Sequence, residues 1–282
     1  MTDNAGSGVL EVPWNLTVPE ADIHLVGYGL RLPNDLTLEA LAVLKRCNRV
    51  FGIPALHAPE FGLPAMENLY LNYGTEKNRH QTYREWLDLV LDAAATDGPV
   101  ALATSGSVMV GALVAHRILE EAPRRGLTVH VTHAASCFDG IWADLNIEPF
   151  FGFTVWEATA FVKLRIRPDT GTTLMLPQAP IFDVTTGPDT TNGTIRTSTA
   201  IAAIRDHLLG HYPPQHQVHF VHTGSGTGAR GFTSTVETLP LAELDHPGRN
   251  PLSTLVVPRL APSTRLDFQR PDTAAAKDTV PG

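Results

Sequence analysis

Residues 21–54 constrain the fold more than any other stretch of this chain, because they combine a strand, a glycine turn, a helix and a second strand. Ile23–Val26 is a short apolar run that predicts a buried strand, and Gly27-Tyr28-Gly29 follows it directly. Apolar residues at helical spacing after Asp35 predict a helix, and Arg49–Pro54 predicts the next strand. This order is one βαβ unit, with its glycines at a turn where a ligand can approach the backbone.

Strands and helices continue to alternate up to residue 145. The predicted strands of this stretch are 68–73, 99–104 and 127–133, and the predicted helices are 78–95, one ending near 121 and one ending at 145. The strand at 99–104 is continuous in apolar residues, which is typical of a strand buried on both faces. The alternation predicts a mostly parallel sheet with helices on both sides.

A second series of elements follows the polar segment 165–171, which we interpret as a linker. It consists of predicted strands at 172–176, 217–221, 234–239 and 252–257 and a predicted helix at 198–209. The predicted fold class is therefore α/β, with two α/β domains. The predicted organisation is an N-terminal arm at 1–20, a first domain at 21–165, a second domain at 172–260 and a disordered tail at 261–282.

Composition argues against several classes of protein. The formal net charge of -8 argues against a nucleic-acid partner, because binding to a phosphate backbone requires clustered lysine and arginine. The two cysteines, Cys47 and Cys137, lie far apart and predict neither a disulfide framework nor a cysteine metal site. Residues 1–20 contain acidic residues and no long apolar run, so we expect neither a signal peptide nor a membrane span. We therefore predict a cytoplasmic protein.

Two glycine-rich loops and several histidines carry weak signals. The Gly27–Gly29 turn lacks the third glycine of a dinucleotide fingerprint, so a tight turn and a ligand loop are equal alternatives. The loop Gly224–Gly228 leads into a strand rather than a helix, which favours a plain hairpin or flexible loop. Two histidine pairs have no acidic or cysteine partner at ligand spacing and predict no metal site: His207 with His211, and His219 with His222.

Tyr73, Arg79 and Tyr83 form a more informative group at the start of the long predicted helix. Arg79 and Tyr83 are one helical turn apart and share a face, and Tyr73 leaves the preceding strand close by. A cation in the first turn opposes the helix macrodipole, which suggests that Arg79 has a partner or a task. Two alternatives stay open. Either the three side chains converge on a site, or Tyr83 begins the apolar stripe of the helix while Arg79 pairs with a carboxylate.

Several segments, taken in order, make the chain similar to the tetrapyrrole methylase superfamily, the class III S-adenosylmethionine-dependent methyltransferases. The resemblance spans roughly residues 23–258. It is carried by Leu25-Val26-Gly27-Tyr28-Gly29, by Leu36-Thr37-Leu38-Glu39-Ala40-Leu41 and by Pro251-Leu252-Ser253-Thr254-Leu255-Val256-Val257-Pro258. It implies two α/β domains of the tetrapyrrole methylase type, with the cofactor cleft between them.

Within the superfamily, four segments resemble the borosin-type α-N-methyltransferases, which methylate backbone amides of a ribosomal peptide: Tyr70–Tyr73, Lys77–Tyr83, Ala143–Pro149 and Trp156–Ala158. The resemblance implies that the catalytic tyrosines and arginine of those enzymes correspond to Tyr73, Arg79 and Tyr83. In such a role Arg79 would stabilise charge that develops on the amide. One of the tyrosines would take the amide proton, provided that a neighbouring cation lowers its pKa.

The resemblance also implies a binding site for S-adenosylmethionine. Its residues come from the glycine turn, from the loops after the fourth and fifth strands and from two segments of the second domain: Gly27, Tyr28, Gly29, Thr104, Ser105, Gly106, Ser107, Met109, Val110, Ser136, Cys137, Leu176, Pro177, Gln178, Leu252, Ser253 and Thr254. Two loops depart from the superfamily pattern. The fourth-strand loop reads Thr104-Ser105-Gly106-Ser107 where a Gly-x-Pro core is usual, and the fifth-strand loop at 133–136 has no proline.

These implications make methylation of backbone amides in a separate peptide the leading functional prediction. Fused borosins carry their substrate as an apolar C-terminal extension, whereas residues 259–282 are polar, so we expect the substrate to come from another chain. The superfamily further implies a homodimer. Two alternatives stay open: methylation of a tetrapyrrole or another small molecule on the same scaffold, and a catalytically silent homologue that binds a partner.

Overall fold

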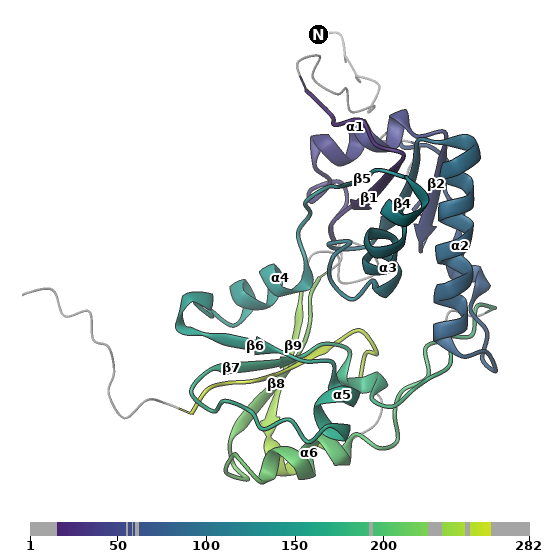
Figure 1. Ribbon diagram of the computed structural model, residues 1–282. Helices are drawn as coiled ribbons and strands as arrows, with labels where there is room; N and C mark the ends of the chain where they lie inside the picture. The colour runs from purple at the N-terminus through teal and green to yellow at the C-terminus, as the bar shows by residue number, and fades with distance from the viewer. Residues whose placement is uncertain are drawn as a thin grey trace, which may run out of the picture.

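The computed structural model describes residues 16–54, 56–57, 59, 62–191, 194–224, 233–245 and 249–260. Two units, each built around a five-stranded sheet, follow one another along the chain (Figure 1). Most of the predicted arm at 1–20, the predicted tail at 261–282 and four of the five residues of the predicted loop Gly224–Gly228 lie outside the described residues.

The first unit contains a fully parallel sheet in the strand order β3-β2-β4-β1-β5. Its strands are β1 (Ile23–Gly27), β2 (Arg49–Ile53), β3 (Glu67–Asn68), β4 (Val100–Thr104) and β5 (Val129–Val131), and its helices are α1 (Leu38–Arg46), α2 (Arg79–Asp97) and α3 (Leu113–Glu121). The predicted mostly parallel sheet is confirmed. Because all five strands run in one direction, the loops that follow them gather at one end of the sheet.

Alternating side chains of the central strands explain why helices cover both faces of this sheet. Leu25 and Leu102 are fully buried in a cluster with residues of α2 and α3, while Val26 and Ala103 are fully buried in a cluster with residues of α1. Successive residues of a strand point to opposite faces, so an apolar strand needs an apolar cover on each side. Thr37 begins α1, since its hydroxyl accepts a hydrogen bond from the Ala40 amide at 3.0 Å.

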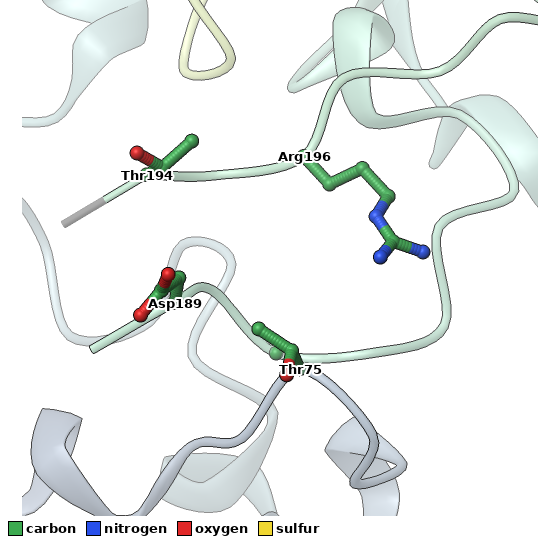
Figure 2. Close-up of a pocket in the computed structure, with 5 residues that line it drawn as sticks. Thr75, Asp189, Thr194 and Arg196 are labelled. Carbon is green, nitrogen blue, oxygen red and sulfur yellow. The ribbon is translucent and has the colours of Figure 1, made fainter. Parts of the chain in front are cut away.

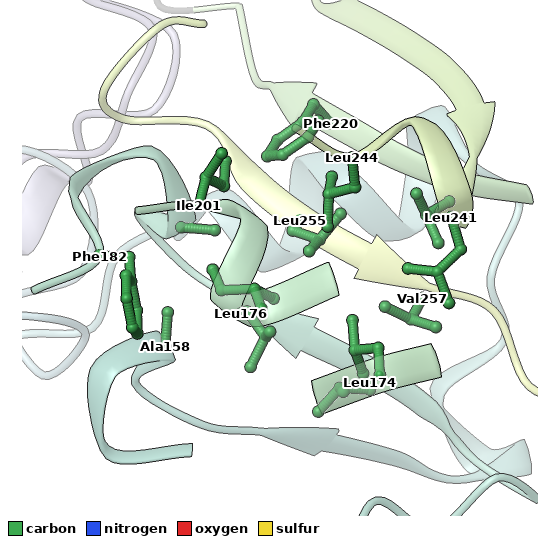
Figure 3. Close-up of a cluster of buried hydrophobic side chains, with 14 of the residues drawn as sticks. Ala158, Leu174, Leu176, Phe182, Ile201, Phe220, Leu241, Leu244, Leu255 and Val257 are labelled. Atoms are coloured by element: carbon green, nitrogen blue, oxygen red, sulfur yellow. The ribbon is translucent and has the colours of Figure 1, made fainter. Parts of the chain in front are cut away.

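The second unit contains a mixed sheet in the strand order β6-β7-β10-β8-β9. Its strands are β6 (Phe153–Val155), β7 (Thr173–Leu176), β8 (Gln217–His222), β9 (Thr235–Pro240) and β10 (Thr254–Val257), and its helices are α4 (Cys137–Asp144), α5 (Ala158–Lys163) and α6 (Ala202–Leu209). Figure 3 shows one of its cores, in which Leu174 and Leu255 pack with residues of α5 and α6. On the other face Met175 and Val256 pack with Ile141 of α4.

The second unit begins earlier in the chain than the sequence analysis predicted. β6 pairs with β7 in parallel register, and Ala158 and Phe161 of α5 are fully buried in the second core. The connection from β5 to α4 joins the two units (Figure 1). The predicted linker at 165–171 therefore falls inside the second unit rather than before it. A polar surface turn within a domain and a linker between domains have the same composition, which explains the misplaced boundary.

Two predicted elements also differ from the structure. The predicted strand at 68–73 ends after Asn68. The Asn68 side chain accepts a hydrogen bond from the Tyr70 amide at 3.2 Å and so begins the 3-10 helix η2 (Leu69–Asn72). The predicted helix after Ser107 begins only with α3, because Gly111 adopts a left-handed backbone with φ 73°. Both differences lengthen the loops at the end of the first sheet where the candidate site lies.

Candidate active site

The loops that follow β1, β4 and β5 meet at three glycines, Gly27, Gly29 and Gly106, which we call the glycine cradle. The Gly29 amide donates to the Gly106 carbonyl at 3.3 Å, and the Gly106 amide donates back at 2.8 Å. A Cβ atom on Gly27 would lie 2.5 Å from the Gly106 oxygen and 2.7 Å from the Ala134 Cβ. The cradle is therefore a point of close backbone approach at the end of a parallel sheet, where ligands of α/β proteins bind.

The cradle contains a buried hydroxyl without a partner. Thr104 is 4% exposed, and its hydroxyl makes no hydrogen bond within the described part of the chain. Leaving such a group unpaired costs about 1–3 kcal/mol, so a ligand that pairs with it gains affinity. Together with the side-chain-free backbone of the glycines, this hydroxyl makes the cradle suitable for a polar ligand such as a nucleoside cofactor.

Tyr28 contributes to this region through both its backbone and its side chain. Its amide donates to the Thr104 carbonyl at 3.0 Å, but its phenol points into the core and donates to the Pro54 carbonyl at 3.1 Å. Burial raises the pKa of this phenol to about 12, while a hydrogen bond with Ser105 acts in the opposite direction. The phenol of Tyr28 thus supports the turn, and the predicted contact of Tyr28 with a cofactor stays a prediction.

The connection from β5 to α4 carries the next two predicted cofactor residues to the second sheet. Ser136 begins α4 and shares a capping box with Asp139. The Thr223 hydroxyl donates to the Cys137 carbonyl at 3.4 Å. Burial raises the pKa of the Cys137 thiol, and a hydrogen bond with Thr254 opposes this shift. The thiol therefore stays protonated at neutral pH and lies against the start of β10.

The remaining cofactor candidates of the second unit lie at the same end of its sheet. Leu176 ends β7 and is paired with Leu255 in antiparallel register, so the segments 177–178 and 252–254 leave the sheet side by side. Gln178 adopts a left-handed backbone with φ 53°. Through Cys137 and Thr254, this end of the second sheet is joined to the loops of the first sheet. The structure thus brings both halves of the predicted cofactor site to the junction of the two units.

Tyr73 and Tyr83 form a pair beside this junction. The Tyr73 hydroxyl donates to the Tyr83 hydroxyl at 3.4 Å, and the ring of Tyr73 packs edge-on against that of Trp86, with 4.9 Å between centroids. Both tyrosines and Met109, from the loop after β4, pack against one apolar cluster. Met109 itself is held by Ser107, whose hydroxyl accepts from its amide at 3.3 Å. The tyrosine pair and the loop after β4 therefore border the same apolar core.

Arg79 contacts a segment of the second unit that we call the strap, residues 184–191 and 194–196. The Arg79 guanidinium donates to the Val184 carbonyl, and the Arg79 amide donates to the Thr185 carbonyl at 2.9 Å. The Gly187 amide donates to the carbonyls of Gly74 at 3.2 Å and Lys77 at 3.3 Å. Figure 1 shows the strap, in green, beside the start of α2. Arg79 thus has a backbone partner rather than the carboxylate of the structural alternative.

The pKa of Tyr73 moves in the direction opposite to the one required for a base. Burial raises it, the neighbouring Tyr83 adds to the shift, and the positive charge of Arg79 offsets only part of it. Tyr73 therefore keeps its proton at neutral pH. The condition for a tyrosine base, a pKa lowered by a neighbouring cation, is therefore not met at Tyr73, because removal from water outweighs the charge of Arg79.

Sequence reasoning did not identify the residues that hold Arg79 and border the tyrosine pair. The strap lies between the predicted strand at 172–176 and the predicted helix at 198–209, where the sequence predicts neither a strand nor a helix. Gly187 was the available signal, since a Cβ there would lie 2.7 Å from the Tyr73 ring. Such a close contact cannot be inferred from one sequence, because it joins residues more than a hundred positions apart.

The structure also bears on metals and membranes. Within the described residues, no three histidine, cysteine, aspartate or glutamate side chains lie close enough together to hold a metal ion. None of the described helices combines the length and the apolar character needed to cross a membrane.

The fold thus consists of two α/β units, with the candidate ligand residues on the loops where the units adjoin. A family model of tetrapyrrole (corrin/porphyrin) methylases matches residues 22–240. The chain therefore belongs to the tetrapyrrole methylase family, and the predicted resemblance to it is confirmed.

Solved structures of this family share the fold. Uroporphyrin-III-C-methyltransferase from Thermus thermophilus is 16% identical with a TM-score of 0.56, over 84% of this chain and 91% of that one. The methyltransferase CobJ is 14% identical with a TM-score of 0.54, over 84% of this chain and 93% of that one. A further structure of the Thermus thermophilus enzyme, with a TM-score of 0.54 at 16% identity over 84% of this chain and 96% of that one, is complexed with S-adenosylhomocysteine. The predicted arrangement of two α/β domains is confirmed.

Two curated relatives are similar in sequence. One is the methyltransferase and type I borosin cyclic peptide precursor of Gymnopilus junonius, 26% identical over 55% of this chain and 38% of that one. The other is the methyltransferase and dendrothelin A precursor of Dendrothele bispora, 30% identical over 51% of this chain and 36% of that one. The chain thus spans little more than a third of the length of these relatives.

Proposed function

We propose that this chain is a methyltransferase that uses S-adenosylmethionine and methylates backbone amide nitrogens of a peptide supplied by another chain. The observation that carries this proposal is that the glycine cradle and the tyrosine pair lie at the same end of the first sheet, where the tyrosines and Met109 border one apolar cluster. Membership of the methylase family supports the reaction type. The two relatives, whose names join a methyltransferase to a cyclic peptide precursor, support the substrate class.

The cofactor fits the residues of the junction. The backbone of Gly27, Gly29 and Gly106 and the unpartnered hydroxyl of Thr104 form the side on the first unit, and the segments 176–178 and 252–254 form the other side. Once bound there, S-adenosylmethionine supplies a methyl group on a positively charged sulfur. Methyl transfer is an in-line displacement, so the protein chiefly positions the acceptor and excludes water.

The side chains of the tyrosine pair and Arg79 act on the acceptor. An amide nitrogen is a weak nucleophile and gains strength when its carbonyl is polarised and its proton is removed. Arg79 uses one of its five N–H groups on the Val184 carbonyl, which leaves donors for the acceptor carbonyl, where negative charge develops. Tyr73 keeps its proton and donates to Tyr83, so the pair orients the Tyr83 oxygen toward its remaining neighbours. We therefore assign Tyr73 as a donor and the phenolate form of Tyr83 as the candidate acceptor of the amide proton.

The homodimer and the cytoplasmic location stay predictions of this proposal. Exposed apolar side chains at one edge of the second sheet support an association between two copies of the chain: Phe150, Phe151, Phe153, Val155 and Trp156. Phe150 is 96% exposed, which is unfavourable in water unless a partner covers it. Sedimentation velocity of the full chain tests this point, and a monomer at micromolar concentration would count against it.

The decisive experiment measures cofactor binding and methyl transfer separately. Isothermal titration of the full chain with S-adenosylmethionine tests the cofactor site. Mass spectrometry of short peptides encoded beside its gene, incubated with chain and cofactor, tests the acceptor. We expect binding and a mass increase of one methyl group per modified amide. Cofactor binding without methylation of any peptide would favour a small-molecule acceptor, and absence of cofactor binding would favour a silent homologue.

A further inference from the structure

The strap and the loop after η2 enclose a pocket of about 260 Å³ lined by Thr75, Gly187, Asp189, Thr194 and Arg196. We infer that this pocket anchors a carboxylate of the acceptor peptide, either an acidic side chain or the free C-terminus. The inference deepens the proposed peptide methylation and rests on it. Figure 2 shows the side chains of both segments around one space, with Thr75 from the first unit and the others from the second.

The position of the pocket relates it to the tyrosine pair. Gly187 lines the pocket and also touches Tyr73, because a Cβ on this glycine would meet the Tyr73 ring at 2.7 Å. One backbone residue thus separates the pocket from the candidate catalytic group. An extended peptide advances about 3.3–3.6 Å per residue, so an anchored residue places a neighbour a few positions away at the tyrosine pair.

Arg196 is the group of this pocket that can recognise an anion. It is exposed and makes no hydrogen bond or ion pair with any part of the chain that the structure describes. Its guanidinium can hold a carboxylate through two parallel hydrogen bonds. One oxygen of Asp189 accepts from the amide and hydroxyl of Thr191, at 2.9 Å and 2.6 Å. Because the charge of Asp189 offsets that of Arg196, recognition depends on the directed hydrogen bonds of the guanidinium, and a highly acidic segment is disfavoured.

The size of the pocket favours a peptide anchor over a whole small molecule. Sites for drug-sized ligands and cofactors measure about 300–1,000 Å³, and this pocket lies below that range. A tetrapyrrole, with several carboxylates on one large ring, exceeds it clearly. A single acidic side chain or a chain end fits it.

The test uses the full chain and three heptapeptide probes of alternating alanine and valine. The first has a central glutamate and blocked ends, the second has glutamine instead, and the third has glutamine and a free C-terminal carboxylate. Isothermal titration measures the affinity of each probe for the wild type, for Arg196→Gln, for Arg196→Lys and for Arg117→Gln. Arg117 lies on α3 with a side chain 57% exposed, outside the pocket, and serves as the matched control.

We expect the wild type to bind a carboxylate probe about tenfold more tightly than the blocked glutamine probe. Arg196→Gln abolishes this preference, Arg196→Lys retains part of it, and Arg117→Gln leaves it unchanged. Tighter binding of the glutamate probe alone identifies a side-chain anchor. Equally tight binding of the free-end probe shows that the pocket also accepts a chain end. Equal binding of all probes to the wild type, no binding of any probe, or an unchanged preference in Arg196→Gln overturns the inference.

A parallel titration with S-adenosylmethionine separates this inference from the proposed function. A carboxylate preference that depends on Arg196, without cofactor binding, keeps the pocket and removes the methyltransferase proposal. Cofactor binding without a carboxylate preference removes the pocket inference and keeps the methyltransferase proposal. Because Arg196 is exposed, its variants should fold normally, and circular dichroism spectra that match the wild type verify this.

Discussion

The glycine cradle lies at the same end of the first sheet as Tyr73, Arg79 and Tyr83, which we call the tyrosine group. Different interactions build the two. The cradle consists of backbone from loops after β1, β4 and β5, and its geometry follows from strand register and the absence of side chains. The tyrosine group consists of side chains, and Arg79 depends on a carbonyl of Val184, which is 105 residues away in the sequence. The glycine cradle is thus local to one unit, whereas the placement of Arg79 needs both.

This difference predicts different consequences of substitution. Changes in the cradle should affect folding and cofactor affinity together, because the same backbone contacts serve both. Changes in the tyrosine group should affect methyl transfer while cofactor affinity stays constant, because these side chains meet the acceptor. The following predictions test this separation, beginning with the largest expected effect.

Arg79→Ala should lower the rate of methyl transfer about 10²–10³-fold, because a preorganised donor at developing charge typically contributes that much. Cofactor affinity should stay unchanged, since stabilisation of the transition state differs from ground-state binding. Single-turnover rates and isothermal titration measure the two quantities. Arg84→Ala, an exposed arginine on the same helix, is the control and should retain full activity. Full activity of Arg79→Ala would remove the catalytic assignment and favour a small-molecule acceptor.

Tyr73→Phe should slow transfer about tenfold, because it loses one hydrogen bond to Tyr83, and Tyr83→Phe should slow it about a hundredfold or more, because it loses the candidate proton acceptor. The rings remain packed against Trp86, so the melting temperature should change little. Tyr70→Phe, whose ring also contacts Tyr73, is the matched control and should keep its rate. A loss of melting temperature with unchanged turnover per folded molecule would support the purely structural alternative.

Gly27→Ala should destabilise the fold by about 1–3 kcal/mol, because the added methyl group overlaps backbone atoms that cannot move independently. Cofactor affinity should fall at the same time. Thermal unfolding and isothermal titration measure both effects. Gly210→Ala is the control, since its Cβ would meet nothing closer than 3.4 Å. If Gly27→Ala loses stability but binds the cofactor normally, the cradle supports the fold without forming the site.

The pH dependence of His24 on β1 should have no effect at neutral pH and should appear only on acidification. Burial, and then the nearby His130 and Arg46, lower the pKa of His24 from 6.5 to about 4, against the opposing charge of Glu39. The unfolded chain therefore takes up a proton first as the pH falls. The part of the free energy of unfolding that depends on a neutral His24 is fully present above pH 6.5 and is lost progressively toward pH 4. It amounts to at most about 3 kcal/mol.

Melting temperatures of the wild type and His24→Leu at about pH 7.5 and pH 5 test this linkage. The wild type should lose more stability on acidification than the variant, which has no ring to protonate. Transfer rates of folded protein should respond in parallel, because His24 precedes the cradle by three residues. Identical pH dependence of both proteins would show that another group controls acid stability.

The sequence by itself determined the first unit, its fold class and the position of the cradle. Apolar runs such as Ile23–Val26 specify buried strands because burial of both faces requires it, and the glycines that follow mark a close backbone approach. Arg79 and Tyr83 share a helix face because helical geometry is local. These features depend on a few neighbouring residues, so a single sequence contains the information.

Only the tertiary structure decided what lies opposite those residues. The second unit takes β6 from before the predicted boundary, because strand pairing follows the register of β7 rather than local composition. Arg79 bonds to the strap, Tyr28 turns into the core, and burial raises the pKa of Tyr73, each through contacts with residues distant in the chain. Such contacts depend on how the two units pack, and burial and charge at a site are properties of that packing.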